Sequence, residues 1–266
     1  MSLRAFSYGG GTQSTAALVL AARGDIDFPL FLFANVGDQA EHPRTLAYVR
    51  EHAIPFAEQH GIEIAVLHKR FRDGREDDLY RSVTDESSSI DIPVRMSNGA
   101  PGNRRCTADF KINVVAKELK RRGATKESPA ALGLGISIDE HHRIRPAFDE
   151  RTPIQLREYP LADLNLTRRD CQKIISSASL PQPGRSACWF CPFHSLDEWR
   201  AIKRETPELF DKACAMERQI NERRARIGKD QVWMTRFARP LEQVVNDQLV
   251  LDVGDLDNCE SGFCMT

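Results

Sequence analysis

The sequence predicts an α/β protein with a doubly wound, mainly parallel sheet and a helical C-terminal extension. Over the first 70 residues, apolar runs alternate with helix-like segments, and glycines or polar residues stand where two of these runs end. A long charged stretch of helical character follows residue 195. We therefore expect an α/β domain at 1–180 and a helical region with a CxxC segment and a Cys-containing tail at 181–266.

The first unit is a strand, a glycine turn and a helix. The apolar residues 3–8, LRAFSY, predict a buried strand, and STAALVLAARGD predicts a helix that begins with hydroxyl residues and ends at Gly24. Three glycines, residues 9–11, lie between them, and this layout directs backbone N–H groups and the helix dipole at an anion. The turn lacks the lysine of a Walker motif and the spacing of a dinucleotide fingerprint. The alternative is a tight turn without a ligand.

The next two units repeat the layout. The continuous apolar run 28–38, FPLFLFANVGD, is typical of a central parallel strand, and an amphipathic helix follows at 42–61. Residues 62–69, IEIAVLHK, predict a third strand. The carboxyl ends of such strands are where ligands bind, so the glycines and Asp38 are expected at one edge. Asp38 and Glu41 could position Mg²⁺ or cap the helix that starts near Pro43.

Composition narrows the class of protein. The chain has 266 residues, with 37 Lys and Arg against 38 Asp and Glu, so no overall basic field indicates nucleic acid. No apolar run is long enough to span a bilayer, and the N-terminus lacks the apolar core of a signal peptide. We expect a cytoplasmic protein without a membrane partner. In a reducing compartment its seven cysteines favour metal binding or thiol chemistry over disulfides.

The cysteines include one pair with the spacing of metal ligands. Cys188 and Cys191 form a CxxC, which can hold both thiolates on one ion or cluster, although a redox dithiol or a zinc half-site has the same spacing. The tail adds Cys259 and Cys264. Cys171 and Cys214 lie at helical positions and are expected to be buried and inert.

Five segments resemble, in order, motifs of the phosphoadenosine phosphosulfate (PAPS) reductase family within the PP-loop, adenine nucleotide alpha-hydrolase-like superfamily. They are SYGGGTQST, ANVGDQAEHPRT, RRCTADFKI, GLGISIDEHHRIR and SACWFCPFHSLDEW, which together cover most of the chain. The chain departs from the common Ser-Gly-Gly-x-Asp-Ser loop at Gly9 and Gln13. It also lacks the adjacent cysteines at Cys106 and the C-terminal Glu-Cys-Gly of the iron–sulfur reductases.

The resemblance implies a Rossmann-like PP-loop fold and a nucleotide, ATP or an adenylyl sulfate, with Mg²⁺ possible. It implies that Cys106 joins Cys188 and Cys191 in binding a [4Fe–4S] cluster, with zinc as the alternative. Cys259 or Cys264 would be a fourth ligand, or Cys264 a mobile nucleophile. Lys111 and Arg143 would contact phosphate or sulfate oxygens. The expected nucleotide contacts are Ser7, Gly9, Gly10, Gly11, Gln13, Ser14, Thr15, Asp38 and Gly135.

The function expected from this combination is sulfur-centred chemistry on an adenine nucleotide. The first version is adenylation of an acceptor with loss of pyrophosphate, followed by sulfur transfer; the second is reduction of an adenylyl sulfate with release of sulfite. A non-catalytic nucleotide-binding module with a structural metal and a tRNA or DNA sulfur-modification enzyme are the alternatives. The expected donor of sulfur or electrons is a cysteine desulfurase or a thioredoxin-like protein. The oligomeric state stays open.

Overall fold

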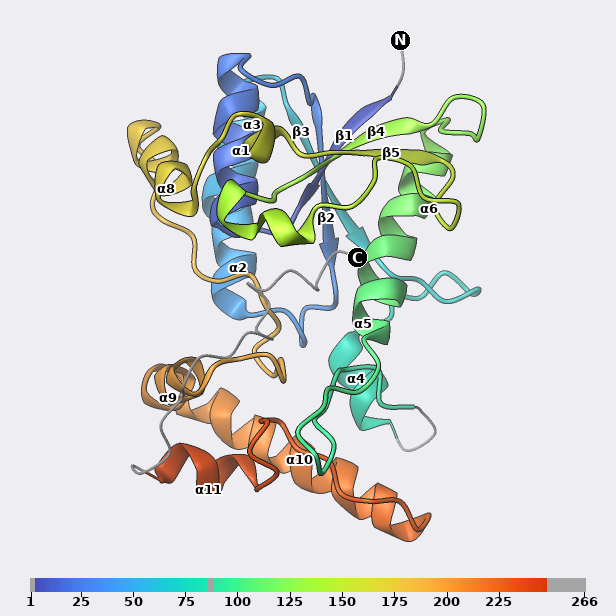
Figure 1. The fold of residues 1–266 in the computed structure, drawn as a ribbon, viewed down its shortest axis with the longest axis vertical. Coiled ribbons are helices and arrows are strands. Elements are labelled where there is room, and N and C mark those ends of the chain that lie inside the picture. The colour runs from blue at the N-terminus through green and yellow to red at the C-terminus, as the bar shows by residue number, and fades with distance from the viewer. Residues whose placement is uncertain (1–2, 86–88, 248–266) are drawn as a thin grey trace.

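The computed structural model describes residues 3–85 and 89–247, and its centre is one parallel sheet (Figure 1). Five strands pair in the order β3-β2-β1-β4-β5, and every pairing is parallel. The order reverses between β1 and β4, which makes their carboxyl ends the switch point where ligands bind in such sheets. The predicted α/β class is confirmed. The strands are β1 (Arg4–Tyr8), β2 (Leu30–Asn35), β3 (Glu63–His68), β4 (Ala130–Leu134) and β5 (Gln155–Glu158).

Helices cover both faces of the sheet, as the parallel pairing requires. One apolar cluster joins Phe6 and Phe31 to Leu18 and Ile175 on one face, and a second joins Leu132 to Leu119 on the other. The helices of the first face are α1 (Thr12–Arg23), α2 (Pro43–Tyr48), the π-helix η1 (Val49–Ala53), α3 (Ile54–Gln59) and α8 (Arg168–Ser177). The second face is covered by α6 (Asn113–Arg121), which continues α5 (Arg105–Thr107) and the π-helix η2 (Ala108–Ile112).

Helix α1 ends as predicted but starts earlier. Gly24 closes it in the left-handed conformation, at φ 80°, which glycine adopts without strain. The N-cap is Gly11 rather than a hydroxyl residue, and the helix begins at Thr12. The expected start at Ser14 is therefore wrong, because the Ser14 hydroxyl lies inside the first turn and accepts a hydrogen bond from Gly11 N at 3.2 Å.

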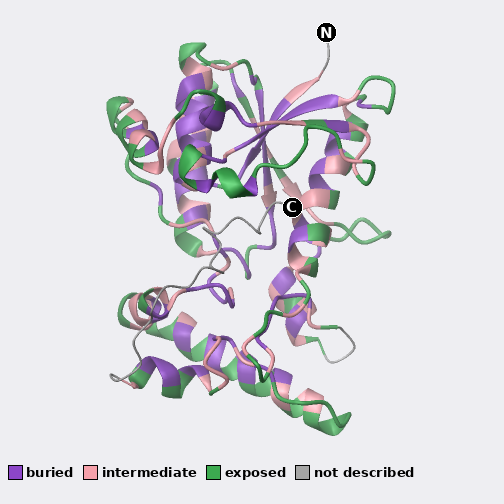
Figure 2. Ribbon diagram, in the orientation of Figure 1, coloured by how far each residue is buried: buried purple, intermediate pink, exposed green. Residues whose placement is uncertain are grey.

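A layer of helices lies beyond the carboxyl edge of the sheet (Figure 1). The predicted interruption at Pro207 is confirmed, since Thr206 leaves the helical conformation between α9 and α10. The apolar core of this layer draws on residues from both sides of residue 180, for example Leu79 and Phe110 as well as Trp199. Figure 2 shows buried positions, in purple, along the helices of this layer. The layer contains α4 (Leu79–Thr84), α9 (Leu196–Glu205), α10 (Pro207–Arg226) and α11 (Leu241–Asn246).

The remaining elements follow β4 and β5 in the chain. They are the 3₁₀ helix η3 (Ile138–Arg143) and α7 (Pro160–Asp163). Among the helices of residues 3–85 and 89–247, none combines the length and the apolar character that crossing a bilayer requires.

Candidate functional site

The glycine turn, residues 9–11, lies at the switch point of the sheet. Gly10 has φ +73°, a conformation that side chains rarely adopt, and a Cβ there would meet Thr45 Cγ2 at 2.9 Å. Gly135, at the end of β4, packs so closely that a Cβ on it would lie 3.3 Å from the backbone nitrogen of Ser14. Small residues at both strand ends therefore let the amino end of α1 open onto a cavity.

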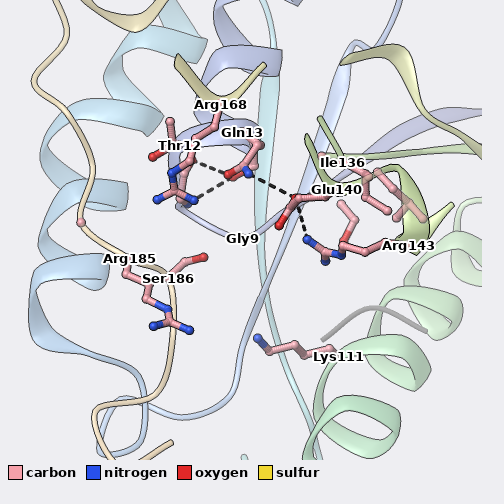
Figure 3. A pocket seen from close by; sticks show the side chains of 16 residues that line it. Gly9, Thr12, Gln13, Lys111, Ile136, Glu140, Arg143, Arg168, Arg185 and Ser186 are labelled. Carbon is pink, nitrogen blue, oxygen red and sulfur yellow. Dashed lines mark hydrogen bonds and ion pairs between the residues drawn. The ribbon is translucent and has the colours of Figure 1, made fainter. Parts of the chain in front are cut away.

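This cavity, of about 130 Å³, combines backbone from the glycine turn with cations from four separate segments (Figure 3). Residues 12–14 of the first helical turn line it, so the positive end of the helix dipole faces the space. Oxyanions are the ligands that such a surface binds. The cationic side chains lining it are Lys111, Arg143, Arg168 and Arg185.

Most of the nucleotide contacts predicted from the sequence line this cavity. They are Ser7, Gly9, Gly11, Gln13, Ser14 and Gly135. The other three lie elsewhere. Gly10 faces α2, and the buried Thr15 hydroxyl lies 3.1 Å from the Tyr8 hydroxyl. Asp38 is exposed and accepts a hydrogen bond from Asn35 Nδ2 at 2.7 Å.

The acidic residues after β2 do not cap the following helix. The N-cap of α2 is His42, whose ring nitrogen accepts a hydrogen bond from Arg44 N at 3.2 Å. Burial, with Arg44 as the next cause, lowers the pKa of His42 to about 4, so its ring is neutral at neutral pH. Glu41 instead pairs its backbone with Cys188 in an isolated antiparallel bridge. The capping role offered for Asp38 and Glu41 is thus filled by the residue that follows them.

Arg143 reaches the cavity with one partner already in place. Its Nη1 lies 2.8 Å from Glu140 Oε2, and both side chains are about 9% exposed. Gln13 Nε2 donates to the same Glu140 oxygen at 3.2 Å, which ties the first turn of α1 to η3. The adjacent Asp139 accepts from Arg168 N at 2.5 Å, at the amino end of α8. A buried carboxylate beside Arg143 offsets part of the positive charge that an anion would meet.

The sequence did not single out the segment that covers the glycine turn. This connecting segment, residues 181–187, runs from α8 to the CxxC, and Gly184, Arg185 and Ser186 all line the cavity. A Cβ on Gly11 would lie 2.8 Å from Ser186 Oγ, whereas one on Gly9 would lie 3.4 Å away. The one available signal was the PQPG sequence at 181–184, which breaks regular structure shortly before the CxxC.

The three predicted thiol ligands come together beside the cavity, and we call Cys106, Cys188 and Cys191 the thiol centre. Cys191 N donates to Cys188 O at 3.1 Å in a tight turn, and Cys106 N donates to Asp91 O at 2.7 Å. Burial, followed by the neighbouring Cys191 thiol, raises the pKa of Cys106 to about 11, against the opposing effects of Lys111 and Arg104. Burial also raises the pKa of Cys188 and of Cys191, and the other two thiols add to the shift at Cys188.

Cations and one buried carboxylate surround the thiol centre. Burial lowers the pKa of Lys111, but Glu41 and all three thiols raise it, so the net shift is upward. Burial lowers the pKa of Arg104, and Cys106 and Cys191 oppose that shift. The Arg104 guanidinium also lies over the Phe193 ring, 5.0 Å from its centroid. Positive charge beside thiols favours the thiolate form.

An iron–sulfur cluster or a zinc ion is the group that the family resemblance implies for these thiols. Within residues 3–85 and 89–247, no three His, Cys, Asp or Glu side chains form a ready-made metal site. The donor set nevertheless fits an anionic cluster, because the thiols lie next to Lys111 and Arg104 rather than among carboxylates alone. Cys259 and Cys264 lie outside the described residues. Cys171 and Cys214 are buried, as predicted.

A polar network holds the CxxC turn against α9. Glu198 Oε2 accepts from Ser195 N at 2.7 Å and lies 3.7 Å from His194 Nδ1, and Glu198 Oε1 pairs with Arg185. The other ring nitrogen of His194 lies 2.9 Å from Cys188 O. Burial raises the pKa of Glu198, but His194 and Arg185 together lower it to about 2. Arg185 therefore links the network to the cavity over the glycine turn.

Comparison with known proteins finds little at the level of sequence. No protein-family model matches the chain, and no curated protein matches it. Among solved structures, the chain is similar to the U34-tRNA thiolase NcsA from Methanococcus maripaludis with its [4Fe–4S] cluster. The two are 14% identical; the similarity covers 82% of this chain and 72% of that chain, with a TM-score of 0.43. So distant a similarity assigns no role to any residue here.

Proposed function

We propose that the protein binds an adenine nucleotide at the glycine turn and uses it for sulfur transfer, activating an acceptor by adenylation with loss of pyrophosphate. One observation carries the proposal. Lys111 lines the cavity over the glycine turn and is also electrostatically coupled to all three thiols. An oxyanion site and a sulfur site that share one cation are suited to a reaction in which a phosphate leaves and sulfur enters.

The reaction proceeds in two substitutions. The acceptor oxygen attacks the α-phosphorus of ATP, the bond to the bridging oxygen breaks, and pyrophosphate leaves with its electron pair. A sulfur nucleophile then attacks the activated carbon, the carbon–oxygen bond breaks, and AMP leaves. The glycine turn and the amino end of α1 would hold the pyrophosphate, and Lys111 would stabilise negative charge that develops on it. Thiolates are the nucleophilic form of sulfur, and the nearby cations offset part of the burial that raises the pKa of these thiols.

Cys106, Cys188 and Cys191 would hold a [4Fe–4S] cluster, which would supply iron that can bind the incoming sulfur. Substitution of these three cysteines tests whether the protein binds the cluster. Cys106→Ser, Cys188→Ser and Cys191→Ser should each lower the iron and sulfide content of anaerobically purified protein, while Cys171→Ser and Cys214→Ser should not. Cys171 and Cys214 are matched controls, since both are buried in helices and neither lines the cavity. Zinc without iron in the wild type would contradict the cluster.

The reaction is tested by its products. Anaerobic protein is incubated with ATP and, separately, with an adenylyl sulfate. Release of pyrophosphate supports adenylation, whereas release of sulfite from the second substrate supports a reductase instead. Binding of ATP without either product would make the protein a nucleotide-binding module. Gly24→Ala is the control for damage to α1 alone, because Gly24 lies at the far end of that helix.

A further inference from the structure

The connecting segment, residues 181–187, forms one wall of the cavity over the glycine turn. A Cβ on Gly9 or on Gly11 would lie 3.4 or 2.8 Å from Ser186 Oγ, so this hydroxyl faces the turn. Figure 3 shows Ser186 directed toward Gly9, whereas the guanidinium of Arg185 points away from the turn. An anion at the turn would therefore lie between the first turn of α1 and the backbone that carries Ser186.

The start of the connecting segment is held by helices that pack on the sheet. Tyr48, which is 6% exposed, donates its hydroxyl hydrogen to Pro181 O at 2.8 Å. Gln182 Nε2 donates to Gln172 O on α8 at 2.8 Å. The prolines at 181 and 183 restrict the backbone further, because each fixes its own φ angle. This end of the segment is therefore fixed without any contribution from the CxxC.

The other end of the connecting segment is held by α9. Arg185 pairs with Glu198 Oε1, and the two side chains are 18% and 28% exposed. The second terminal nitrogen, Arg185 Nη2, lies 3.5 Å from Phe193 O. Glu198 does not line the cavity over the glycine turn; it lines a separate cavity of about 190 Å³ together with His42 and Glu205. Among the contacts of Glu198 with other described residues, the ion pair with Arg185 is therefore the one that leads to the anion site.

We propose that Glu198 is a positioning residue for the anion at the glycine turn: by holding Arg185 it keeps Ser186 over the turn and slows the departure of the anion. The inference rests on the proposed function, since the anion is the phosphate chain of the nucleotide. Glu198 also lies 3.7 Å from His194 Nδ1, and the other ring nitrogen of His194 lies 2.9 Å from Cys188 O. The connecting segment is thus held by the same residues that hold the CxxC turn.

The direction of the effect separates positioning from simple charge. Glu198 is negatively charged, so electrostatics alone predicts that its neutralisation strengthens the binding of another anion nearby. Loss of its hold on Arg185 predicts weaker binding instead. Glu198→Gln keeps a side-chain oxygen for Ser195 N, which donates to the carboxylate at 2.7 Å, so α9 retains its cap. Weaker anion binding by this variant therefore reports the position of the connecting segment.

Affinity for inorganic pyrophosphate is measured by calorimetry on the full chain, purified anaerobically. Glu198→Gln should weaken binding roughly tenfold, and phosphorus NMR exchange measurements should show faster dissociation without slower association. In an Arg185→Met background, Glu198→Gln should have no further effect, because its influence passes through Arg185. Glu205→Gln is the matched control: Glu205 is also on α9 and pairs with Arg44 at 2.8 Å, and this variant should bind like the wild type.

A change at the other end of the connecting segment gives the same test without altering charge. Tyr48→Phe removes the hydrogen bond to Pro181 O and should speed the dissociation of pyrophosphate roughly fivefold, the loss of one hydrogen bond. Pyrophosphate that binds Glu198→Gln as tightly as the wild type, or more tightly, would overturn this inference alone. Failure of pyrophosphate to bind the wild type would overturn the proposed function and this inference with it.

Discussion

The glycine turn and the thiol centre share Lys111, yet they are formed by different kinds of groups. The glycine turn uses backbone and small residues, and it is contiguous in the chain between β1 and α1. The thiol centre gathers side chains from residues 106, 188 and 191 and surrounds them with ionisable groups such as Glu41 and Lys111. Its geometry therefore depends on distant segments and on charge, whereas that of the turn depends mainly on local conformation.

This difference implies different sensitivities. A backbone site has no titrating group, so it should respond to steric changes and not to pH near neutrality. A site of buried thiols, cations and carboxylates should respond to the loss of any one charge, because an uncompensated buried charge is costly. The four predictions below run from the largest expected effect to the smallest. Each one affects the glycine turn and the thiol centre unequally.

The largest effect is expected from Lys111→Met, because Lys111 lines the cavity over the glycine turn and also interacts with the thiol centre. Glu41 is 4% exposed, and Lys111 stabilises its buried negative charge. Loss of that cation should lower the free energy of unfolding by about 3 kcal/mol. Affinity for inorganic pyrophosphate should fall as well. Lys117→Met, on the exposed face of α6, is the matched control.

A double variant separates the two roles of Lys111. Glu41→Gln with Lys111→Met should recover most of the stability, since no buried carboxylate remains, but pyrophosphate should still bind weakly. Chemical denaturation gives the first quantity and calorimetry the second. Recovery of both would show that Lys111 acts on the anion only through folding.

The second prediction concerns pH and the helical layer that carries the CxxC. Burial raises the pKa of Glu217 to about 7 from 4.5, although Met234 N and Leu241 N donate to its two oxygens at 2.9 and 3.0 Å. The folded state therefore binds more protons than the unfolded state between these values. The free energy of unfolding should fall by about 3 kcal/mol as pH rises from about 4.5 to 7.

Variants of Glu217 isolate this contribution from other titrating groups. Glu217→Gln should be less stable at low pH, because its amide nitrogen faces a backbone N–H donor, but it should lose the slope between pH 5 and 7. Denaturation at several pH values measures the slope directly. A slope that persists in the variant would assign the titration to another group.

The sequence predicted the glycine turn better than it predicted the connecting segment, residues 181–187, that covers the turn. The strand, the three glycines and Gly24 are local signals, and local signals need no knowledge of packing. The position of Ser186 over Gly11 depends on how residues 181–187 return to the sheet, and no periodic pattern encodes that. Asp38 was misplaced for a related reason: it follows β2, but its side chain is exposed and bonded to Asn35 within its own turn.

The thiol centre shows what spacing can and cannot predict. CxxC spacing places Cys188 beside Cys191, but only the resemblance to a family suggested Cys106, because some 80 residues separate them. Lys111 came from the same comparison of motifs. The buried carboxylate Glu41 was seen only as a possible magnesium ligand or cap, since sequence alone did not reveal its backbone bridge to Cys188.

The third prediction uses two neighbouring glycines as a matched pair. A Cβ on Gly11 would lie 2.8 Å from Ser186 Oγ, while one on Gly9 would be at an ordinary 3.4 Å. Gly11→Ala should therefore weaken pyrophosphate binding roughly tenfold, about 1.4 kcal/mol, and Gly9→Ala should change it little. Combining Gly11→Ala with Ser186→Gly should restore part of the affinity. No recovery would mean that the methyl group obstructs the anion itself.

The fourth prediction, with the smallest expected effect, compares two helix caps, one on each side of the cavity. Ser195 caps α9 directly after the CxxC, and Thr167 caps α8 on the sheet; both form capping boxes. Replacing either by alanine should cost about 1 kcal/mol in the free energy of unfolding. Only Ser195→Ala should also speed the alkylation of thiols, because its helix carries Glu198, which contacts His194 and Arg185.

Alkylation rates are measured in a background where Cys171, Cys214, Cys259 and Cys264 are serine, so that only the thiol centre contributes. The Thr167→Ala rate should equal that of the parent despite the same loss of stability. Equal acceleration in both variants would show that thiol access follows global unfolding, and the two halves would then not be energetically separate. Acceleration by Ser195→Ala alone places the stability of the thiol centre in α9, apart from the sheet that holds the glycine turn.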